Sequence, residues 1–308
     1  MITPPKMANE VKWATRQRYQ YIEVMAFYTG VITRKDVART FAISDAAATK
    51  DLKAYGLVAP NNLTYKQNVF GFVPSDSFVA MFADLSPQVV LSMFSANLAV
   101  RGNPTATEPN THQNWIYGLT VDQLPLPTRL PDKNICAQLV RAISNKQKLQ
   151  VQYLSLSDIT ENTKTRIIEP HSLVDNGLRW HVRAYNEDSY DFRDFVLSRI
   201  IAATLINVDA ESSAKYDDDW SEYVTLKLKP HPKLSLQKQQ SLLYDFNVLE
   251  NDDNKGLIEL AVRRALVAYV LQRLSVDTTE DHSLNPNSFQ LVLINRDDIE
   301  WFAGWSFI

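Results

Sequence analysis

Residues 166–200 read RIIEPHSLVDNGLRWHVRAYNEDSYDFRDFVLSRI, and the rest of the chain is organised around this stretch. Two alternating runs flank Asp175-Asn176-Gly177, residues that tolerate the left-handed backbone of a tight β-hairpin turn. Strand side chains alternate between two faces, so the second run has one apolar face and one polar face. The apolar face holds Trp180, Val182 and Ala184, and the polar face holds Arg179, His181, Arg183 and Tyr185.

The polar face of this run places like charges next to each other. Such a face is tolerable where it meets solvent, acidic neighbours or an anionic ligand. One interpretation is a solvated face paired with Asp188, Asp191 or Asp194. The other is a pocket for an anion, and the residue types alone leave both interpretations open.

Length, cysteine content and hydropathy place the chain in a broad class. Its 308 residues are long for one domain and predict two or three. Cys136 stands alone, so an internal disulfide framework is excluded and a reducing compartment is expected. No apolar run approaches the roughly 20 residues that span a bilayer, and residues 1–13 lack the apolar stretch of a signal peptide. We therefore expect a cytoplasmic protein with no membrane partner.

The first 75 residues are basic, although the chain as a whole is acidic. They hold ten Lys and Arg against five Asp and Glu, a net charge of +5, which leaves −8 for the remainder of a chain whose total is −3. A basic end on an acidic body indicates a polyanionic partner such as nucleic acid.

Residues 1–75 also carry the pattern of a winged helix-turn-helix domain. Helices are expected at 13–28, 34–42 and 45–55, with Thr33 and Ser44 as the caps of the last two. Only two residues separate those two helices, which is the layout of a helix-turn-helix. Residues 63–66 and 69–73 then predict two short strands that form the wing. A small helical dimerisation domain is the alternative.

The third of these helices is the candidate recognition helix. Ala48 and Leu52 are expected to face the core, which turns the opposite side of the helix toward solvent. Alanine methyls can contact thymine, threonine can hydrogen-bond a base edge or a phosphate, and lysine suits phosphates. Little arginine is present for reading guanine, so DNA shape and phosphate contacts should contribute much of the affinity. The candidate DNA-binding residues are Arg34, Ser44, Asp45, Ala46, Ala47, Thr49, Lys50, Lys53 and, at the wing tip, Lys66 and Gln67.

Residues 76–131 are expected to form a helical connector. Two apolar helical patches are predicted at 78–85 and 87–99, and Ser86-Pro87 is a suitable start for the second. Residues 101–114 are rich in Gly, Pro, Thr and Asn, which predicts a loop, and residues 124–127 predict a stiff extended linker. The apolar face of the second helix packs within the chain or forms a dimer contact, and both uses stay open.

Two further domains are expected, at 132–208 and 222–308. The first has a helix at 135–145, a strand at 149–155, the hairpin and a strand at 195–208, which predicts a small bent barrel of the SH3 or Sm type. The second alternates strand and helix and suits a ferredoxin-like α+β domain. Between them, residues 217–219 are three aspartates that predict a solvated acidic connector. The fold class is α+β and multidomain.

Four segments of the chain match a pattern known from one family. They are 153–157 (YLSLS), 166–173 (RIIEPHSL), 177–185 (GLRWHVRAY) and 192–200 (FRDFVLSRI). With them the chain resembles the WYL-domain transcriptional regulators, and more narrowly the BrxR and CapW repressors found beside bacterial phage-defence systems. The resemblance extends over nearly the whole chain. Two departures are Trp180-His181-Val182 in place of the name-giving Trp-Tyr-Leu, and Val196 where an arginine often follows phenylalanine.

The resemblance implies a homodimeric repressor of a phage-defence operon of the BREX kind and of its own promoter. Its partners would be a double-stranded operator with an inverted repeat and an anionic effector, such as short single-stranded nucleic acid or a nucleotide. The effector would bind at the WYL domain and relieve repression. Arginines there can bind phosphates, Tyr and His can stack on bases, and Ser and His can hydrogen-bond. The candidate effector-binding residues are Tyr153, Ser155, Arg166, His171, His181, Arg183, Arg193 and Arg199.

Alternatives to these assignments stay open. Arg199 can instead pair with Asp194 or Glu169 inside the barrel. The sequence has no GxxxxGK[ST] or GxGxxG loop, no HExxH pair and no Cys/His cluster, so no cofactor, metal or catalytic residue is expected. One rival function is an activator whose effector increases DNA binding. The other is a magnesium-dependent nucleic-acid-processing enzyme that uses the aspartates at 217–219.

Overall fold

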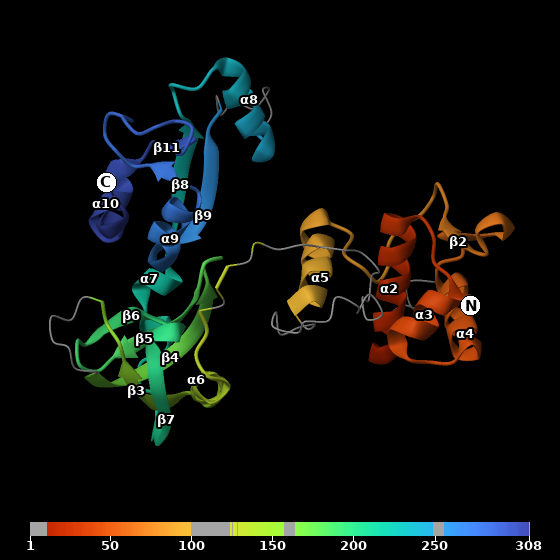
Figure 1. The fold of residues 1–308 in the computed structure, drawn as a ribbon, viewed down its shortest axis with the longest axis horizontal. Helices are drawn as coiled ribbons and strands as arrows, with labels where there is room; N and C mark the ends of the chain where they lie inside the picture. The colour runs from red at the N-terminus through yellow and green to blue at the C-terminus, as the bar shows by residue number, and fades with distance from the viewer. Residues whose placement is uncertain are drawn as a thin grey trace. The chain divides into compact units, whose positions relative to one another are not determined.

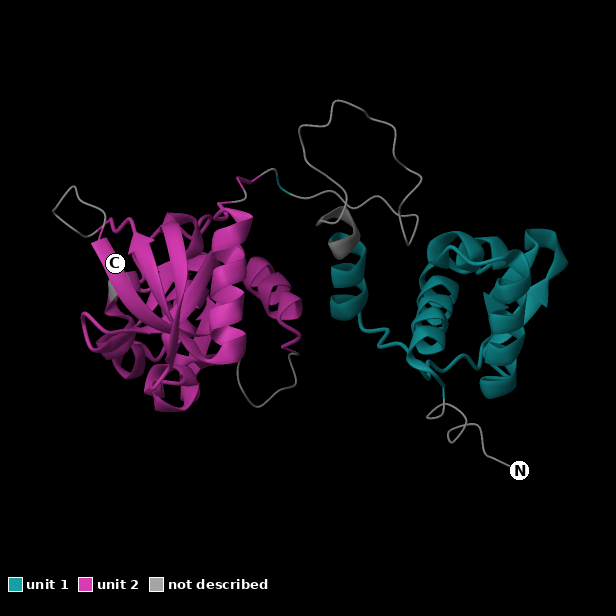
Figure 2. Ribbon diagram, turned by 90° about the horizontal axis from the view of Figure 1, so that it is seen from below, with its two compact units in different colours: residues 1–125 teal, residues 126–308 magenta. Residues whose placement is uncertain are grey.

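The computed structural model describes residues 11–99, 124, 126, 127, 129–156, 164–248 and 256–307 of the chain. The chain divides into two compact units, residues 1–125 and 126–308, which Figure 2 distinguishes by colour. The loop predicted at 101–114 lies outside the described residues. Within the described ranges, no helix is both long and apolar enough to cross a membrane.

The first unit begins with three helices and a two-stranded wing (Figure 1). The predicted cap of the second helix is confirmed, because Thr33 and Asp36 form a reciprocal capping box. The cap of the third is confirmed too, because the Ser44 hydroxyl accepts the backbone N–H of Ala47. The elements are α2 (Trp13–Thr29), α3 (Arg34–Phe41), α4 (Asp45–Val58), β1 (Leu63–Lys66) and β2 (Gly71–Pro74).

One core holds the three helices and the wing together. The predicted inward residues of α4, Ala48 and Leu52, are buried in it. Ile32, between α2 and α3, pairs with Phe72 of β2 through an isolated antiparallel bridge. Gly71 permits this close approach, because a Cβ at that position would lie 2.7 Å from a methyl group of Val31.

The second strand of the wing is shorter than predicted. Residues 69 and 70 are expected in that strand, but Gln67–Val69 form a 3-10 turn and Phe70 adopts a left-handed backbone with a φ of 49°. β2 therefore begins at Gly71. The wing needs a left-handed residue to reverse the chain, and Phe70 takes that conformation although glycine or asparagine adopts it more readily.

The connector holds one of its two predicted helices. α5 (Pro87–Ala99) begins where Ser86-Pro87 predicts, and packs Val90 and Phe94 against Val24 of α2. The helix predicted at 78–85 is wrong, since that segment has no helical turn. The cause is Glu23, a fully buried carboxylate whose oxygens accept the backbone N–H groups of residues 81, 82 and 83 at 2.9, 2.8 and 2.7 Å. Backbone donors bound to this side chain cannot serve the interior of a helix.

The second unit begins with one helix and a five-stranded antiparallel sheet (Figure 1). Along the sheet the strand order is β6-β5-β4-β3-β7, and the core lies between the sheet and α6. The predicted hairpin is confirmed, since Asp175 pairs with Trp180 and Gly177 has a φ of 77° in the loop between them. The elements are α6 (Lys133–Asn145), β3 (Gln147–Tyr153), β4 (Lys164–Asp175), β5 (Trp180–Asn186), β6 (Asp191–Val196) and β7 (Ile200–Asp209).

The single strand predicted at 195–208 is two strands. A 3-10 turn at Leu197–Arg199 ends β6 and starts β7. The turn carries the chain from one edge of the sheet to the other, because β6 pairs with β5 whereas β7 pairs with β3. Apolar residues stand directly before and after the turn, so the local pattern does not separate the two strands. Whether the sheet closes as an SH3- or Sm-like barrel stays a prediction.

The chain ends in a mixed domain whose sheet order is β10-β11-β8-β9. The predicted alternation of strand and helix is confirmed, with β10 as an additional short strand parallel to β11. The ferredoxin-like classification stays a prediction. The short helix α7 (Asp218–Ser221) leads into this domain. Its elements are β8 (Tyr223–Pro230), α8 (Leu236–Asp245), β9 (Ile258–Arg263), α9 (Val267–Arg273), β10 (Val276–Asp277), β11 (Leu291–Leu293) and α10 (Arg296–Ala303).

Candidate nucleic-acid interface and effector site

The recognition helix α4 exposes the face that the sequence predicts. Lys50 and Lys53 are exposed, and Thr49 is half-buried beside them. Asp45 and Ala46 are exposed at the start of the helix, and Ala47 lies at the boundary. Two free ammonium groups on one solvent-facing side suit contacts with DNA phosphates.

Some candidate side chains on this face already have partners. The Thr49 hydroxyl donates to the backbone carbonyl of Asp45 at 2.8 Å, and the Ser44 hydroxyl caps the helix. Arg34 lies 3.7 Å from the carboxylate of Asp45, and both side chains are well exposed. The interactions of Thr49 and Arg34 are weak ones at the surface, so either side chain can turn to a DNA phosphate or base at little cost.

A groove of about 610 Å³ lies between α3, α4 and the wing. Tyr65 and Phe70 stand on its wing side with 54% and 75% of their surface exposed. Aromatic rings beside cations are typical of surfaces that bind nucleic acids. Lys35, Tyr65 and Phe70 line this groove but are not among the DNA-binding residues predicted from the sequence. Aromatic residues interleaved with lysines are the sequence signal that could have identified them. The groove is lined by Thr33, Arg34, Lys35, Thr49, Leu52, Lys53, Tyr65, Phe70 and Phe72.

The polar face of β5 is buried, unlike the surface of α4. Arg183 has only 6% of its surface exposed and donates two hydrogen bonds to Asp217, at 2.7 and 2.9 Å. The His171 ring nitrogen Nε2 lies 3.2 Å from the same carboxylate. Burial raises the pKa of Asp217, but the hydrogen bonds from His171 and Arg183 outweigh burial and hold the pKa below its usual value. The face therefore holds an internal anion.

Asp217 lies where a solvated acidic connector is predicted, and that prediction is wrong for this residue. Its side chain is only 1% exposed and also caps α7 by accepting the backbone N–H of Trp220. Asp219, two residues on, bonds to Arg264 at 2.5 Å. Burial beside arginines, which local sequence cannot reveal, is the physical reason. Among the described residues, no group of three or more His, Cys, Asp or Glu could hold a metal ion.

A second contact joins the β5 face to the C-terminal domain. Asp194 on β6 lies 3.5 Å from Arg183 and accepts a hydrogen bond from the Tyr269 hydroxyl at 3.0 Å. Burial raises the pKa of Asp194, against the opposing effect of Arg183. The Tyr269 ring packs on His181 at 4.9 Å between centroids. Residues from both domains therefore converge on the same strand.

His181 is buried, and within the described part of the chain neither ring nitrogen has a hydrogen-bond partner. Burial, helped by the charges of Arg179 and Arg199, lowers its pKa to about 4. The imidazole is therefore neutral at physiological pH. A neutral histidine here does not add positive charge to the face, which corrects the expectation from residue type that Arg, His and Arg together form a cationic row.

The other candidate effector residues have surroundings that differ from those of Arg183. Tyr153 is buried and its hydroxyl accepts the backbone N–H of Val196, with the Arg166 guanidinium 5.8 Å from its ring centre. Arg193 is exposed and lies 3.7 Å from Asp191. Ser155 and Arg199 are half-buried. His171 and Arg183 meet at Asp217, whereas His181 is linked to Arg183 only through Tyr269 and Asp194.

The carboxylates that the sequence offers to Arg199 are engaged elsewhere. Asp194 pairs with Arg183, and Glu169 pairs with Lys148 at 3.1 Å. Arg264, which follows β9, makes salt bridges with Asp219 and Glu222 and stacks over Trp301. These ion pairs stabilise the packing of the second unit.

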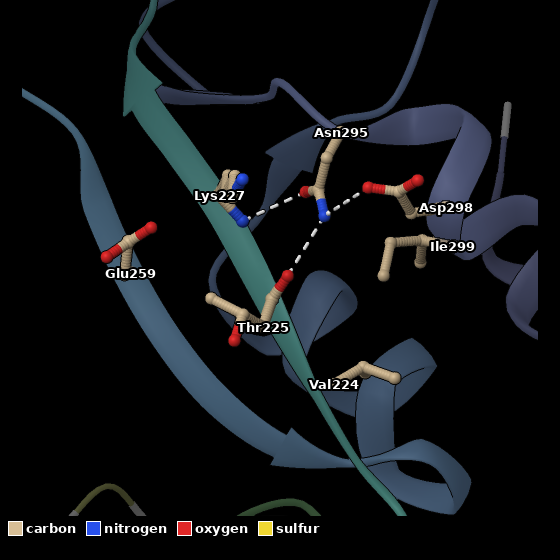
Figure 3. Close-up of a pocket in the computed structure, with 7 residues that line it drawn as sticks. All are labelled: Val224, Thr225, Lys227, Glu259, Asn295, Asp298 and Ile299. Carbon is tan, nitrogen blue, oxygen red and sulfur yellow. Dashed lines mark hydrogen bonds between the residues drawn. The ribbon is translucent and has the colours of Figure 1, made fainter.

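Two hollows of the second unit differ in chemistry. One, of about 460 Å³, lies between β6 and α9 and is lined by Arg183, Arg193 and Arg264 together with three aspartates. The other, of about 500 Å³, lies against β8, where Asn295 donates to the carbonyl of Thr225 and accepts from the N–H of Lys227 (Figure 3). The polar groups of Asn295 are already satisfied there. The first hollow, which gathers arginines, is the better candidate for an anion.

Comparison with known proteins matches all three domains. Residues 14–96 match the BrxR transcriptional regulator winged helix-turn-helix domain, residues 134–205 the WYL domain, and residues 223–299 the BrxR transcriptional regulator C-terminal dimerization domain. A DNA-binding transcriptional repressor CapW of Escherichia coli (strain KTE188) is 30% identical over 290 residues, which cover 94% of this chain and 91% of the relative. The chain belongs to the BrxR and CapW family of transcriptional regulators.

Further relatives and one solved structure extend this comparison. The CapW repressor of Pseudomonas aeruginosa is 30% identical over 291 residues, 94% of this chain and 92% of the relative. The CapW repressor of Stenotrophomonas maltophilia is 26% identical over 297 residues, 95% and 93% of the two chains. Proteasome accessory factor B/C of Arthrobacter aurescens matches with a TM-score of 0.25 at 14% identity, over 88% of this chain and 44% of that one.

The family assignment confirms the resemblance on which the sequence predictions drew. A winged helix and a WYL domain are both present, as predicted. The first family model continues to residue 96 and so takes in α5. The model of residues 223–299 is described as a dimerization domain, a role that the sequence reasoning did not give to this domain.

Proposed function

We propose that the chain is a homodimeric, cytoplasmic transcriptional repressor that binds duplex DNA through α4 and the wing. The observation that carries the proposal is the exposed side of α4, where Lys50 and Lys53 lie beside a groove rimmed by Tyr65 and Phe70. The CapW relatives are named DNA-binding transcriptional repressors, and they align over more than nine-tenths of this chain. A helix of this kind enters the major groove, and the wing reaches the adjacent backbone.

We propose that the C-terminal domain forms the dimer. The description of its family model supports this, and so do Leu236 and Tyr244 on α8, which expose more than three-quarters of their surface. A twofold dimer presents two recognition helices to two half-sites about one helical turn apart, so the operator would be an inverted repeat. A dimer contact through α5 stays a prediction.

We propose that the WYL domain binds the anionic effector and that binding relieves repression. Arginines at the hollow between β6 and α9 support an anion, and the aromatic rings of Phe192 and Tyr269 beside them support a nucleobase. Short single-stranded nucleic acid or a nucleotide meets both requirements. The promoter of the chain's own gene and a phage-defence operon of the BREX kind are the proposed targets, on the strength of the BrxR family name.

Electrophoretic mobility shift with the DNA upstream of the chain's own gene tests the DNA-binding role. The double variant Thr49→Ala with Lys50→Ala should lose about tenfold or more in affinity, because it removes a polar group and a phosphate-directed cation from α4. The matched control is Lys133→Ala, which removes an exposed lysine from α6 in the other unit. Wild-type affinity in the double variant would show that α4 is not the reading helix.

A further inference from the structure

The segment that joins the WYL sheet to the C-terminal domain places a carboxylate on the WYL arginine. Asp217 lies in the segment between β7 and β8, and its two oxygens accept hydrogen bonds from Nε and Nη2 of Arg183. Its Oδ2 also lies 3.2 Å from the His171 ring. A bidentate carboxylate offers Arg183 the same charge and geometry that a phosphate would offer. A ligand phosphate that binds the Nε and Nη2 edge of Arg183 must therefore take the place of Asp217.

The same segment is attached to the C-terminal domain on its other side. The backbone carbonyl of Trp220 accepts a hydrogen bond from Arg263, and Asp219 pairs with Arg264. The Trp220 indole packs edge-on against the His171 ring at 5.5 Å between centroids. Figure 1 shows α7, which carries these residues, between the WYL sheet and the C-terminal domain. Displacement of Asp217 would consequently act on the contact between the two domains.

The contact between the WYL sheet and the C-terminal domain also contains polar groups that destabilise it. His181 is 1% exposed under the Tyr269 ring, and neither of its ring nitrogens has a hydrogen-bond partner among the residues that the structure describes. A buried polar atom without a partner loses its bond to water and gains nothing in exchange. Opening of the contact would return these nitrogens to solvent, so the closed arrangement is less stable than its salt bridges alone imply.

We infer that Asp217 is an internal competitor of the effector, bound to Arg183 and His171 until an anionic ligand displaces it. Displacement frees the segment at 210–222 and loosens the C-terminal domain from the WYL sheet, which gives effector binding a route to the dimer. This inference rests on the proposed effector role of Arg183 and His171. It assigns to Asp217 a regulatory role instead of a purely structural one.

The test is binding of a short 5′-phosphorylated, fluorescein-labelled oligothymidylate to the full chain, measured by anisotropy. Asp217→Asn removes the competing charge, while the asparagine oxygen can still cap α7. This variant should bind the probe about tenfold more tightly than the wild type, since a charge-assisted pair no longer has to be broken. Asp218→Asn is the matched control, because it removes an equal charge from the adjacent, exposed residue and should bind as the wild type does.

A second background separates competition from a general loosening of the fold. With Arg183→Gln in place, Asp217→Asn should give no gain in affinity, because the site of competition is gone. Asp217→Ser, which also retains a capping oxygen, should reproduce the gain if the asparagine variant does not fold. Equal or weaker binding by both Asp217 variants, with the wild type binding the probe, would overturn the competitor role alone. No binding by any variant would overturn the effector site too, whereas the DNA-binding role is judged separately by mobility shift of the wild type.

Discussion

The surface of α4 and the polar face of β5 both carry basic residues, but in opposite environments. On α4, Lys50 and Lys53 point into solvent, and Thr49 beside them is bound only to its own helix. On β5, Arg183 is buried and bonded to Asp217, and His181 lies under Tyr269. An exposed cation can meet DNA without any rearrangement, whereas a buried one can meet a ligand only after a contact opens. The first arrangement suits permanent recognition, and the second suits conditional sensing.

The largest expected effect is on stability, and it tests whether Arg183 on β5 is held in a buried ion pair with Asp217. Arg183→Ala should lower the free energy of unfolding of the second unit by about 3 kcal/mol or more, because it leaves Asp217 as a buried charge without its main partner. Urea denaturation followed by far-UV circular dichroism measures this change. The control is Arg193→Ala, whose pair with Asp191 is exposed and 3.7 Å long, and which should change stability by about 0.5 kcal/mol or less. Equal losses of stability in the two variants would show that the buried pair of Arg183 with Asp217 stabilises the fold no more than an exposed ion pair does.

The next effect is a loss of stability at acid pH that depends on His181. The folded-state pKa of His181 is about 4 against an ordinary value of 6.5, so between these values the unfolded chain binds the extra proton. Its contribution to stability is complete above about pH 6.5 and is lost as the pH falls toward 4, by about 3 kcal/mol at most. His181→Phe should flatten this part of the stability profile, measured by urea denaturation at a series of pH values. A profile parallel to that of the wild type would show that His181 is not buried neutral.

The smallest effect concerns the wing. Phe70→Ala should leave stability nearly unchanged, because the side chain is 75% exposed and alanine keeps the same left-handed backbone cost. Its affinity for operator DNA should fall by about 1 kcal/mol, roughly fivefold, if the ring packs on the nucleic acid. Thermal unfolding and mobility shift measure the two quantities. Phe72→Ala is the contrasting variant and should lower stability, since the half-buried Phe72 packs against the core. A loss of stability in Phe70→Ala would place that ring in the fold and not in the interface.

Local patterns predict the parts of this fold that local physics determines. Thr33 and Ser44 cap their helices because each hydroxyl meets an N–H three residues on. Pro87 starts α5 for an equally local reason, and Gly177 marks the hairpin loop by its positive φ. The outward face of α4 follows from the helical period, once Ala48 and Leu52 are assigned to the core.

The remaining features depend on partners that are far away in the sequence. Glu23 prevents a helix about 60 residues later by binding its backbone, and no pattern within residues 78–85 reveals this. Asp217 looks like part of a solvated acidic run, yet Arg183, 34 residues before it, holds it in a buried site. The candidate effector residues could be predicted from residue type and family resemblance. Their contacts with Asp217, Asp194 and Tyr269 could not be predicted. A buried charge is recognised only when the residue that neutralises it is known.

The proposed repressor is tested most directly by footprinting of the full chain on the DNA upstream of its own gene, with and without the phosphorylated oligothymidylate. We expect protection of an inverted repeat whose half-sites lie about one helical turn apart, and loss of that protection as the oligonucleotide is added. The sign of the change also separates a repressor from an activator, because coupling between two binding sites must appear as a changed DNA affinity. Absence of protection, or protection that strengthens as the oligonucleotide is added, would contradict the proposed function.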